Sequence, residues 1–88
     1  MKIKTGFTIK QQQGRTLVEP NEEQSLTFNK VIQLDNSGKL LFEALIEGSD
    51  EKSLIALLME KYNISHDEAR KDVNIFIQIL KLNQLLED

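Results

Sequence analysis

The stretch from Leu34 to Gly48 constrains the fold of this chain most strongly, because it carries signals for both the start and the end of a helix. Asp35 can accept hydrogen bonds from the free N–H groups of a first helical turn, and Asn36 and Ser37 are alternative caps. Gly48 can adopt the left-handed conformation that closes a helix. A helix of this length is marginal alone in water, so other parts of the chain must cover its apolar stripe. That stripe consists of Leu41, Phe42, Leu45 and Ile46, widened by Leu40.

Two further helices follow in the sequence. The second is capped by Ser49 and Asp50, covers roughly residues 51–61 and ends at Asn63. The third begins at a capping box, in which the Ser65 hydroxyl caps the helix and the Glu68 side chain reaches back. This third helix runs to about Leu82, and Leu85 and Leu86 are expected to fold back onto the core.

The first third of the chain is extended. Ile3, Phe7 and Ile9 alternate with polar residues between Lys2 and Gly14, which predicts a strand with Gly14 in the turn. Residues 15–19 form the returning strand, which stops at Pro20 because proline has no N–H for the ladder. Residues 31–34 are predicted as a third strand, with Phe28 covering the edge of the sheet. Three strands followed by three helices predict an α+β fold.

Composition limits the possible functions. The length of 88 residues predicts one domain over residues 1–88, with a core too small for a large internal substrate cavity. The net charge is −3, and the acidic excess lies in residues 49–88, where a DNA-reading helix would be found. This distribution argues against nucleic acid as a partner. The chain has no cysteine, signal peptide or membrane span, and we expect a cytoplasmic protein without membrane contact.

Signals for catalysis and cofactor binding are weak. His66 is the only histidine, and it stands in the first turn of a capped helix, where side chains are usually solvated. No nucleophile or orienting partner for it can be recognised, and no phosphate-binding glycine loop occurs. Asp67, Glu68 and Asp72 are better explained as the acidic start of a helix than as a metal site. We therefore expect neither enzymatic activity nor a cofactor or metal.

The third helix has two apolar faces. At 100° per residue, the face expected to meet the core consists of Ala69, Val73, Phe76, Ile77 and Leu80. A second stripe, made of Ile75, Ile79 and Leu82, lies away from Val73. Such a stripe on a small domain often marks a site for a partner. The alternative is that Ile79 and Leu82 pack under the C-terminal tail or the second helix.

A set of short motifs runs through nearly the whole chain: Phe28-Asn29, Leu34-Asp35-Asn36-Ser37-Gly38, Phe42, Gly48, Asp72, Val73, Phe76, Ile77, Leu80, Leu85 and Leu86. In order and spacing these motifs resemble the PqqD family of pyrroloquinoline quinone biosynthesis, and the wider class of recognition elements for ribosomally made, modified peptides. The chain departs from the family pattern at a few positions. Asp35 and Ser37 stand where the family usually has Asn and Thr, Gln84 replaces a glycine, and Ile75 and Ile79 occupy positions that are more often small or polar.

The resemblance implies a winged helix-turn-helix-like fold with a three-stranded antiparallel sheet and three helices. It implies a non-catalytic chaperone that binds the leader of a precursor peptide by β-strand addition. The chaperone would present this peptide to a modifying enzyme such as a radical SAM maturase or a leader peptidase. Whether the pathway makes pyrroloquinoline quinone or another peptide natural product stays open.

The resemblance also implies a binding site. The leader would pair with the backbone of residues 31–34, and it would lie in a groove lined by the third helix. Arg70 or Lys71 would meet acidic leader residues. The full predicted set is Val31, Ile32, Gln33, Leu34, Arg70, Lys71, Asp72, Ile75, Phe76, Ile79 and Asn83.

Two alternative functions stay open. The same topology occurs in winged-helix DNA-binding regulators, although the charges Arg70, Lys71 and Lys81 are offset here by acidic neighbours. The second stripe of the third helix could instead close a structural homodimer.

Overall fold

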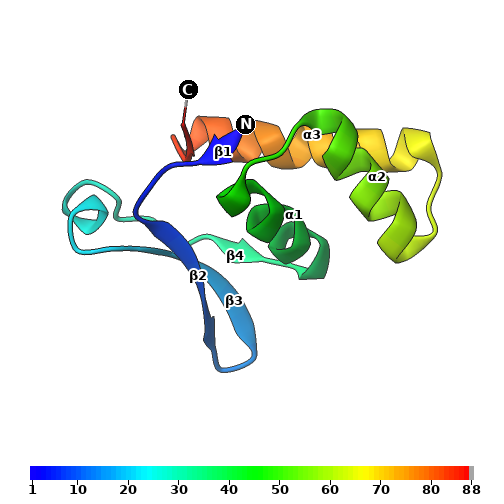
Figure 1. Ribbon diagram of the computed structural model, residues 1–88. Coiled ribbons are helices and arrows are strands. Elements are labelled where there is room, and N and C mark those ends of the chain that lie inside the picture. The colour runs from blue at the N-terminus through cyan, green and yellow to red at the C-terminus, as the bar shows by residue number, and fades with distance from the viewer. Residues whose placement is uncertain (88) are drawn as a thin grey trace.

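Three helices pack beside a small antiparallel sheet in the computed structural model, which describes residues 1–87 (Figure 1). The sheet has the order β2-β3-β4, and a separate two-stranded ribbon joins β1 to β5. The predicted sheet of three strands followed by three helices is confirmed. The elements in chain order are β1 Lys2–Ile3, β2 Phe7–Gln12, β3 Arg15–Pro20, a 3₁₀ turn η1 Gln24–Leu26, β4 Gln33–Leu34, α1 Asn36–Glu47, α2 Glu51–Tyr62, α3 His66–Leu82 and β5 Leu86–Glu87.

The helix boundaries follow the predicted caps. Asp35 Oδ1 accepts the Gly38 N–H at 2.7 Å and starts α1, and Gly48 ends this helix with a φ of 100°. Asp50 caps α2 through the Ser53 N–H at 2.7 Å, and hydrogen bonding to Ser53 lowers the pKa of the Asp50 carboxyl. The remaining ends also agree with prediction, since Asn63 closes α2 in the left-handed conformation and the Ser65 hydroxyl accepts the Glu68 N–H at 3.1 Å. The second bond of a capping box, from the Ser65 N–H to the Glu68 carboxylate, is not formed among residues 1–87, so the predicted capping box is only half present.

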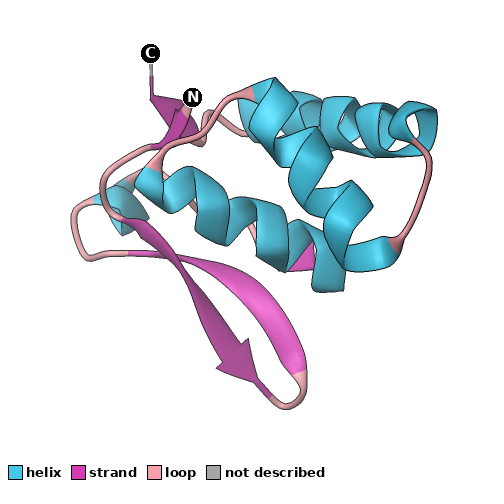
Figure 2. Cartoon of the chain, turned by 45° about the vertical axis from the view of Figure 1, so that its right-hand side comes forward, coloured by secondary structure: helices cyan, strands magenta, loops and turns pink. Residues whose placement is uncertain are grey.

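The predicted strand between Lys2 and Gly14 is broken in two. Gly6 has a φ of 102°, a conformation that L-residues rarely adopt, and it separates β1 from β2. A Cβ at Gly6 would lie 2.7 Å from Gln24 Cγ, so the turn is also too tight for a side chain. After this break β1 pairs with β5, which brings the two ends of the chain together, while β2 and β3 form the long hairpin that projects below the helices (Figure 2).

The third strand is shorter than predicted. Only Gln33 and Leu34 count as strand, although the Val18 N–H still donates to the Ile32 carbonyl at 2.9 Å. In the same register the next hydrogen-bonded pair would need an N–H from Pro20, which has none. Val31 is therefore outside the ladder, and its side chain is 83% exposed.

One apolar core joins all layers of the fold. Its fully buried side chains come from α1, α2, α3 and the segment after α3, which includes Leu85 as predicted. Phe28 is half-buried and packs edge-on against Phe7, with ring centroids 5.1 Å apart. No polar side chain is buried among the described residues. The helices of residues 1–87 are all too short or too polar to cross a bilayer.

The cap at Asp35 offers a first test of this account. We expect Asp35→Ala to lower the free energy of unfolding by about 1 kcal/mol, because the Gly38 N–H loses its acceptor. Urea denaturation measures this change. Asp35→Asn is the matched control, since asparagine keeps an oxygen at the same place and should retain most of the stability. Equal stability of the two variants would show that the cap contributes nothing.

Candidate functional site

The candidate site begins at the open edge of β4. The register pairs Thr16 with Leu34 and Leu17 with Gln33, and the Ile32 carbonyl is bound to β3. Because backbone groups alternate between the two edges of an antiparallel strand, the N–H and C=O of Gln33 point away from β3. Within residues 1–87 no other strand pairs with this edge.

A groove of about 290 Å³ runs along this edge. One wall is formed by β4 and the residue before it, the opposite wall by one face of α3, and the end by the first turns of α1. The size is close to the lower limit of roughly 300 Å³ for small-molecule pockets, and an open trough of this kind suits an extended segment better. Its lining residues are Ile32, Gln33, Leu34, Asp35, Ser37, Gly38, Leu41, Asp72, Ile75, Phe76 and Ile79.

The floor of the groove belongs to the buried core, whereas its apolar rim is exposed. Leu41 and Phe76 belong to the core and are 2% and 8% exposed. Ile75 and Ile79 form the rim, where 52% and 41% of their surface faces solvent. A ligand in the groove can therefore bury two large aliphatic side chains without rearranging the core.

Leu82 does not belong to the groove. It is 77% exposed, although it continues the stripe of Ile75 and Ile79 along α3. The alternative that Ile79 and Leu82 pack under the C-terminal tail or the second helix is thus wrong. The tail pairs with β1 instead, as part of the β1–β5 ribbon.

The structure brings together seven of the eleven residues that the sequence predicted for the site, namely Ile32, Gln33, Leu34, Asp72, Ile75, Phe76 and Ile79. Arg70 and Lys71 do not line the groove, because they stand about 200° and 100° around the helix from Asp72. Val31 points into solvent. Asn83 ends α3 and accepts a hydrogen bond from Lys30 Nζ at 3.1 Å, so it ties the loop before β4 to the helix.

Four lining residues were not predicted as part of the site: Asp35, Ser37, Gly38 and Leu41. The available signal was the cap itself, since a helix that begins directly after an edge strand must place its first turn at the end of that strand. Because Gly38 has no side chain, the first turn of α1 can lie close to Leu34 at the end of β4. A Cβ there would lie 3.2 Å from Asp35 Oδ1 and 3.4 Å from Leu34 Cβ.

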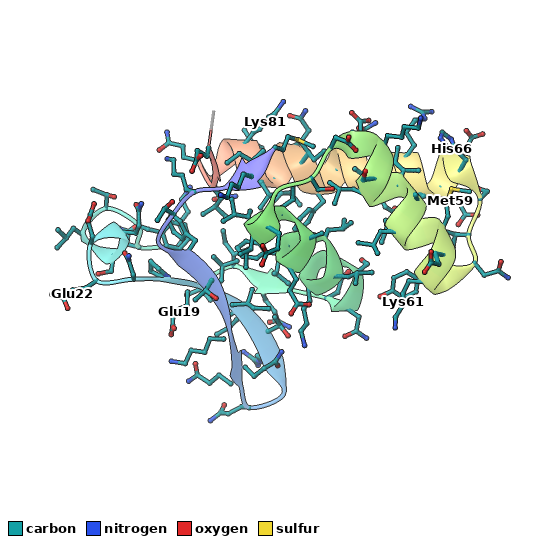
Figure 3. All side chains as sticks on the ribbon, in the orientation of Figure 1. Glu19, Glu22, Met59, Lys61, His66 and Lys81 are labelled. Carbon is teal, nitrogen blue, oxygen red and sulfur yellow. The ribbon has the colours of Figure 1, made fainter. Side chains whose placement is uncertain are left out.

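Charge is distributed unevenly along the groove. Asp35 and Asp72 stand at the α1 end, and neither forms an ion pair within residues 1–87. His66 lies at the outer start of α3, exposed and 3.9 Å from the Asp67 carboxylate, away from the groove (Figure 3). In the same part of the chain, no three His, Cys, Asp or Glu side chains gather as a metal site would require.

Comparison with known proteins identifies relatives of this fold. The family model of coenzyme PQQ synthesis protein D (PqqD) matches residues 15–86. The solved structure of TbiB1 in complex with the TbiA(beta) leader peptide is 20% identical in sequence, with a TM-score of 0.78 over 99% of this chain and 95% of that chain. Lasso peptide synthetase B1 complexed with the leader peptide is 15% identical, with a TM-score of 0.75 over 99% of this chain and 96% of that chain. Sequence comparison with curated proteins gives no match. The structural likeness confirms the predicted α+β fold.

Proposed function

The chain belongs to the PqqD family, and on this premise we propose that it binds the leader segment of a ribosomally made precursor peptide in the groove between β4 and α3. The leader adds to the sheet as a further strand next to β4. The protein then presents the peptide to a separate modifying enzyme, and its own contribution is binding and not catalysis.

The observation that supports this proposal most strongly is the open edge at Gln33 beside a groove with an unpaired apolar rim. An unpaired edge strand is a template for another chain, and its backbone groups give affinity with little demand on sequence. The neighbouring helix supplies the selective contacts. Ile75 and Ile79 contribute these contacts from α3, directly across from β4.

The geometry of β4 sets the pattern of the leader. Leu34 is buried toward the helices, whereas Gln33 is exposed on the other face. An added strand continues this alternation, so every second leader residue faces α3 and the residues between them face solvent. Two or three buried apolar anchors contribute about 1.5–3 kcal/mol each, less the ordering costs, which corresponds to micromolar to high-nanomolar affinity.

The partner that performs the chemistry is a separate protein in this proposal. A radical SAM maturase or a leader peptidase would receive the bound peptide. The protein holds only the leader, so the segment to be modified stays accessible to that enzyme. Binding takes place in the cytoplasm, where ribosomal precursors are made. The two relatives described above were solved as complexes with their leader peptides, which supports the same kind of ligand here.

An NMR titration tests the proposal residue by residue. We expect a leader encoded by a short open reading frame beside the gene to slow the hydrogen exchange of the Gln33 amide. The Leu34 amide, which faces β3, is already protected and should change little. Shifts should also appear along α3 from Asp72 to Ile79. A DNA duplex of the same concentration serves as the control for the regulator alternative.

The outcome has a clear meaning in either direction. If the leader shifts α3 but leaves the Gln33 exchange rate unchanged, strand addition is wrong. If only the duplex produces shifts, concentrated on α3, the protein is a DNA-binding regulator and the delivery function must be abandoned.

A further inference from the structure

A second hollow adjoins the groove at the start of α1. Its volume is about 520 Å³, and three residues line both spaces: Asp35, Ser37 and Asp72. Beyond this shared boundary the walls come from the end of α2 and the connection to α3, where Leu58, Tyr62 and Ile64 stand. The two hollows are therefore neighbours that meet at these three side chains, and the second one lies past the end of β4.

The second hollow has the character of a side-chain pocket. Leu58 belongs to the core and is 1% exposed, and Ile64 is half-buried. Tyr62 is 39% exposed, so a large part of its ring is available to a ligand. An aromatic ring beside aliphatic side chains offers apolar contact together with a hydroxyl that can form a hydrogen bond.

The boundary between the hollows is negatively charged. Asp35 uses Oδ1 to cap α1 and to accept the Ser37 hydroxyl at 3.0 Å, which partly compensates its charge. Asp72 has no ion-pair partner within the described chain. A peptide that crosses from one hollow to the other passes both carboxylates, so a basic residue is complementary at this point.

We propose that the second hollow is a subsite for the same leader peptide, which places a large apolar or aromatic side chain against Tyr62 after leaving the edge of β4. A basic leader residue lies at the crossing beside Asp35 and Asp72. This inference rests on the proposed function, because the strand in the groove delivers the flanking residues to the subsite. The occupant is the leader and not a free small molecule, since the hollow is open and adjoins the groove at Asp35, Ser37 and Asp72.

The test uses a displayed library of random 18-residue peptides selected on the intact protein. Selected binders should share an alternating apolar segment and, on one flank, a basic residue followed by an apolar or aromatic residue. Each binder is then shortened to its alternating segment. We expect Tyr62→Ala to weaken the full binder about tenfold and to leave the shortened binder unchanged. Tyr62→Phe should keep most of the affinity.

Two further variants separate an effect at the subsite from general damage to the protein. Lys61→Ala changes an exposed neighbour on α2 that does not line the hollow, and it should alter neither peptide (Figure 3). Asp72→Asn should weaken binding about threefold, and only for peptides that carry the basic residue. Circular dichroism verifies that all variants are folded.

The results distinguish the subsite from the groove. If Tyr62→Ala affects full and shortened binders equally, or affects neither, the subsite is wrong while the proposed function is untouched. If Ile79→Asp leaves the shortened binder unchanged, the groove is not the strand site and the proposed function fails. A library that yields no binder at all would overturn both.

Discussion

Replacing Ile79 with aspartate is expected to weaken leader binding about 100-fold. Ile79 stands on the rim of the groove with 41% of its surface exposed, so a bound peptide covers an apolar side chain that the free protein leaves partly in water. Only the 41% of Ile79 that is still exposed can be buried by the leader, so the substitution removes about 0.6–1.2 kcal/mol of apolar burial. It also requires a carboxylate to lose its hydration on binding, which costs at least as much. Because a tenfold change in affinity corresponds to about 1.4 kcal/mol, these two costs together reach the expected size. Isothermal titration calorimetry with the leader measures it.

Leu82→Asp is the matched control. It makes a comparable change of charge and size on the same helix, but Leu82 lies outside the groove and is 77% exposed. Leu82→Asp should keep its folding stability within about 0.5 kcal/mol of the parent, as is usual for exposed positions, whereas Ile79→Asp also loses the covered part of its side chain and should lower the free energy of unfolding by about 1 kcal/mol. If the two substitutions weaken the leader equally, the effect does not come from the groove.

The same pair of variants tests the homodimer alternative by light scattering. In a dimer closed by the stripe of α3, a carboxylate at either position would be buried without a partner. Both variants would then lower the molar mass. A mass unchanged by either substitution, together with a selective loss of leader binding in Ile79→Asp, excludes a dimer through this surface.

The helical half could be predicted from sequence because its signals are local. Asp35, Asp50 and Ser65 each accept an N–H three residues later, and this bond depends only on the residue type and the adjacent backbone. Gly48 and Asn63 close helices for an equally local reason, since both adopt a positive φ. These five residues defined the helix boundaries to within about one residue.

The errors in the extended half arose from distant contacts. The pairing of β1 with β5 joins segments more than eighty residues apart, and nothing near Lys2 indicates its partner. The strand break at Gly6 depends on the approach of Gln24 and Asn21 from another loop. The shortening of β4 depends on Pro20, which was recognised as the end of its own strand but not as the limit of the neighbouring one.

Part of the site could be predicted from the family resemblance. The resemblance indicated which face of α3 and which strand would meet, and Phe76, Ile79 and Ile32 do line one groove. The prediction of Arg70 and Lys71 rests on their charge, whereas helical geometry turns both away from the face that contains Asp72. The α1 end of the groove does not follow from the sequence, because the role of Asp35 as a helix cap accounts for that residue without any ligand.

Gln33→Pro is expected to weaken leader binding at least about tenfold while the sheet stays intact. The Gln33 N–H points to the open edge, so proline removes a donor that only the leader would use. The loss of a backbone hydrogen bond costs about 0.5–1.5 kcal/mol, and the proline ring also occupies space where the added strand would lie. The β3–β4 ladder keeps its bond from the Val18 N–H to the Ile32 carbonyl, and the free energy of unfolding should change by no more than about 1 kcal/mol.

Gln33→Ala separates the backbone from the side chain in the same experiment. Alanine keeps the N–H and removes the exposed amide, so leader affinity should stay within about threefold of the parent if the backbone is the binding group. Calorimetry with one leader on the three proteins gives the comparison, and urea denaturation shows that they are equally folded. A proline variant that binds as well as the alanine variant would mean that the leader does not pair with β4, even if it occupies the groove. Weak binding by both variants would instead assign recognition to the Gln33 side chain, and strand addition would lose its main support.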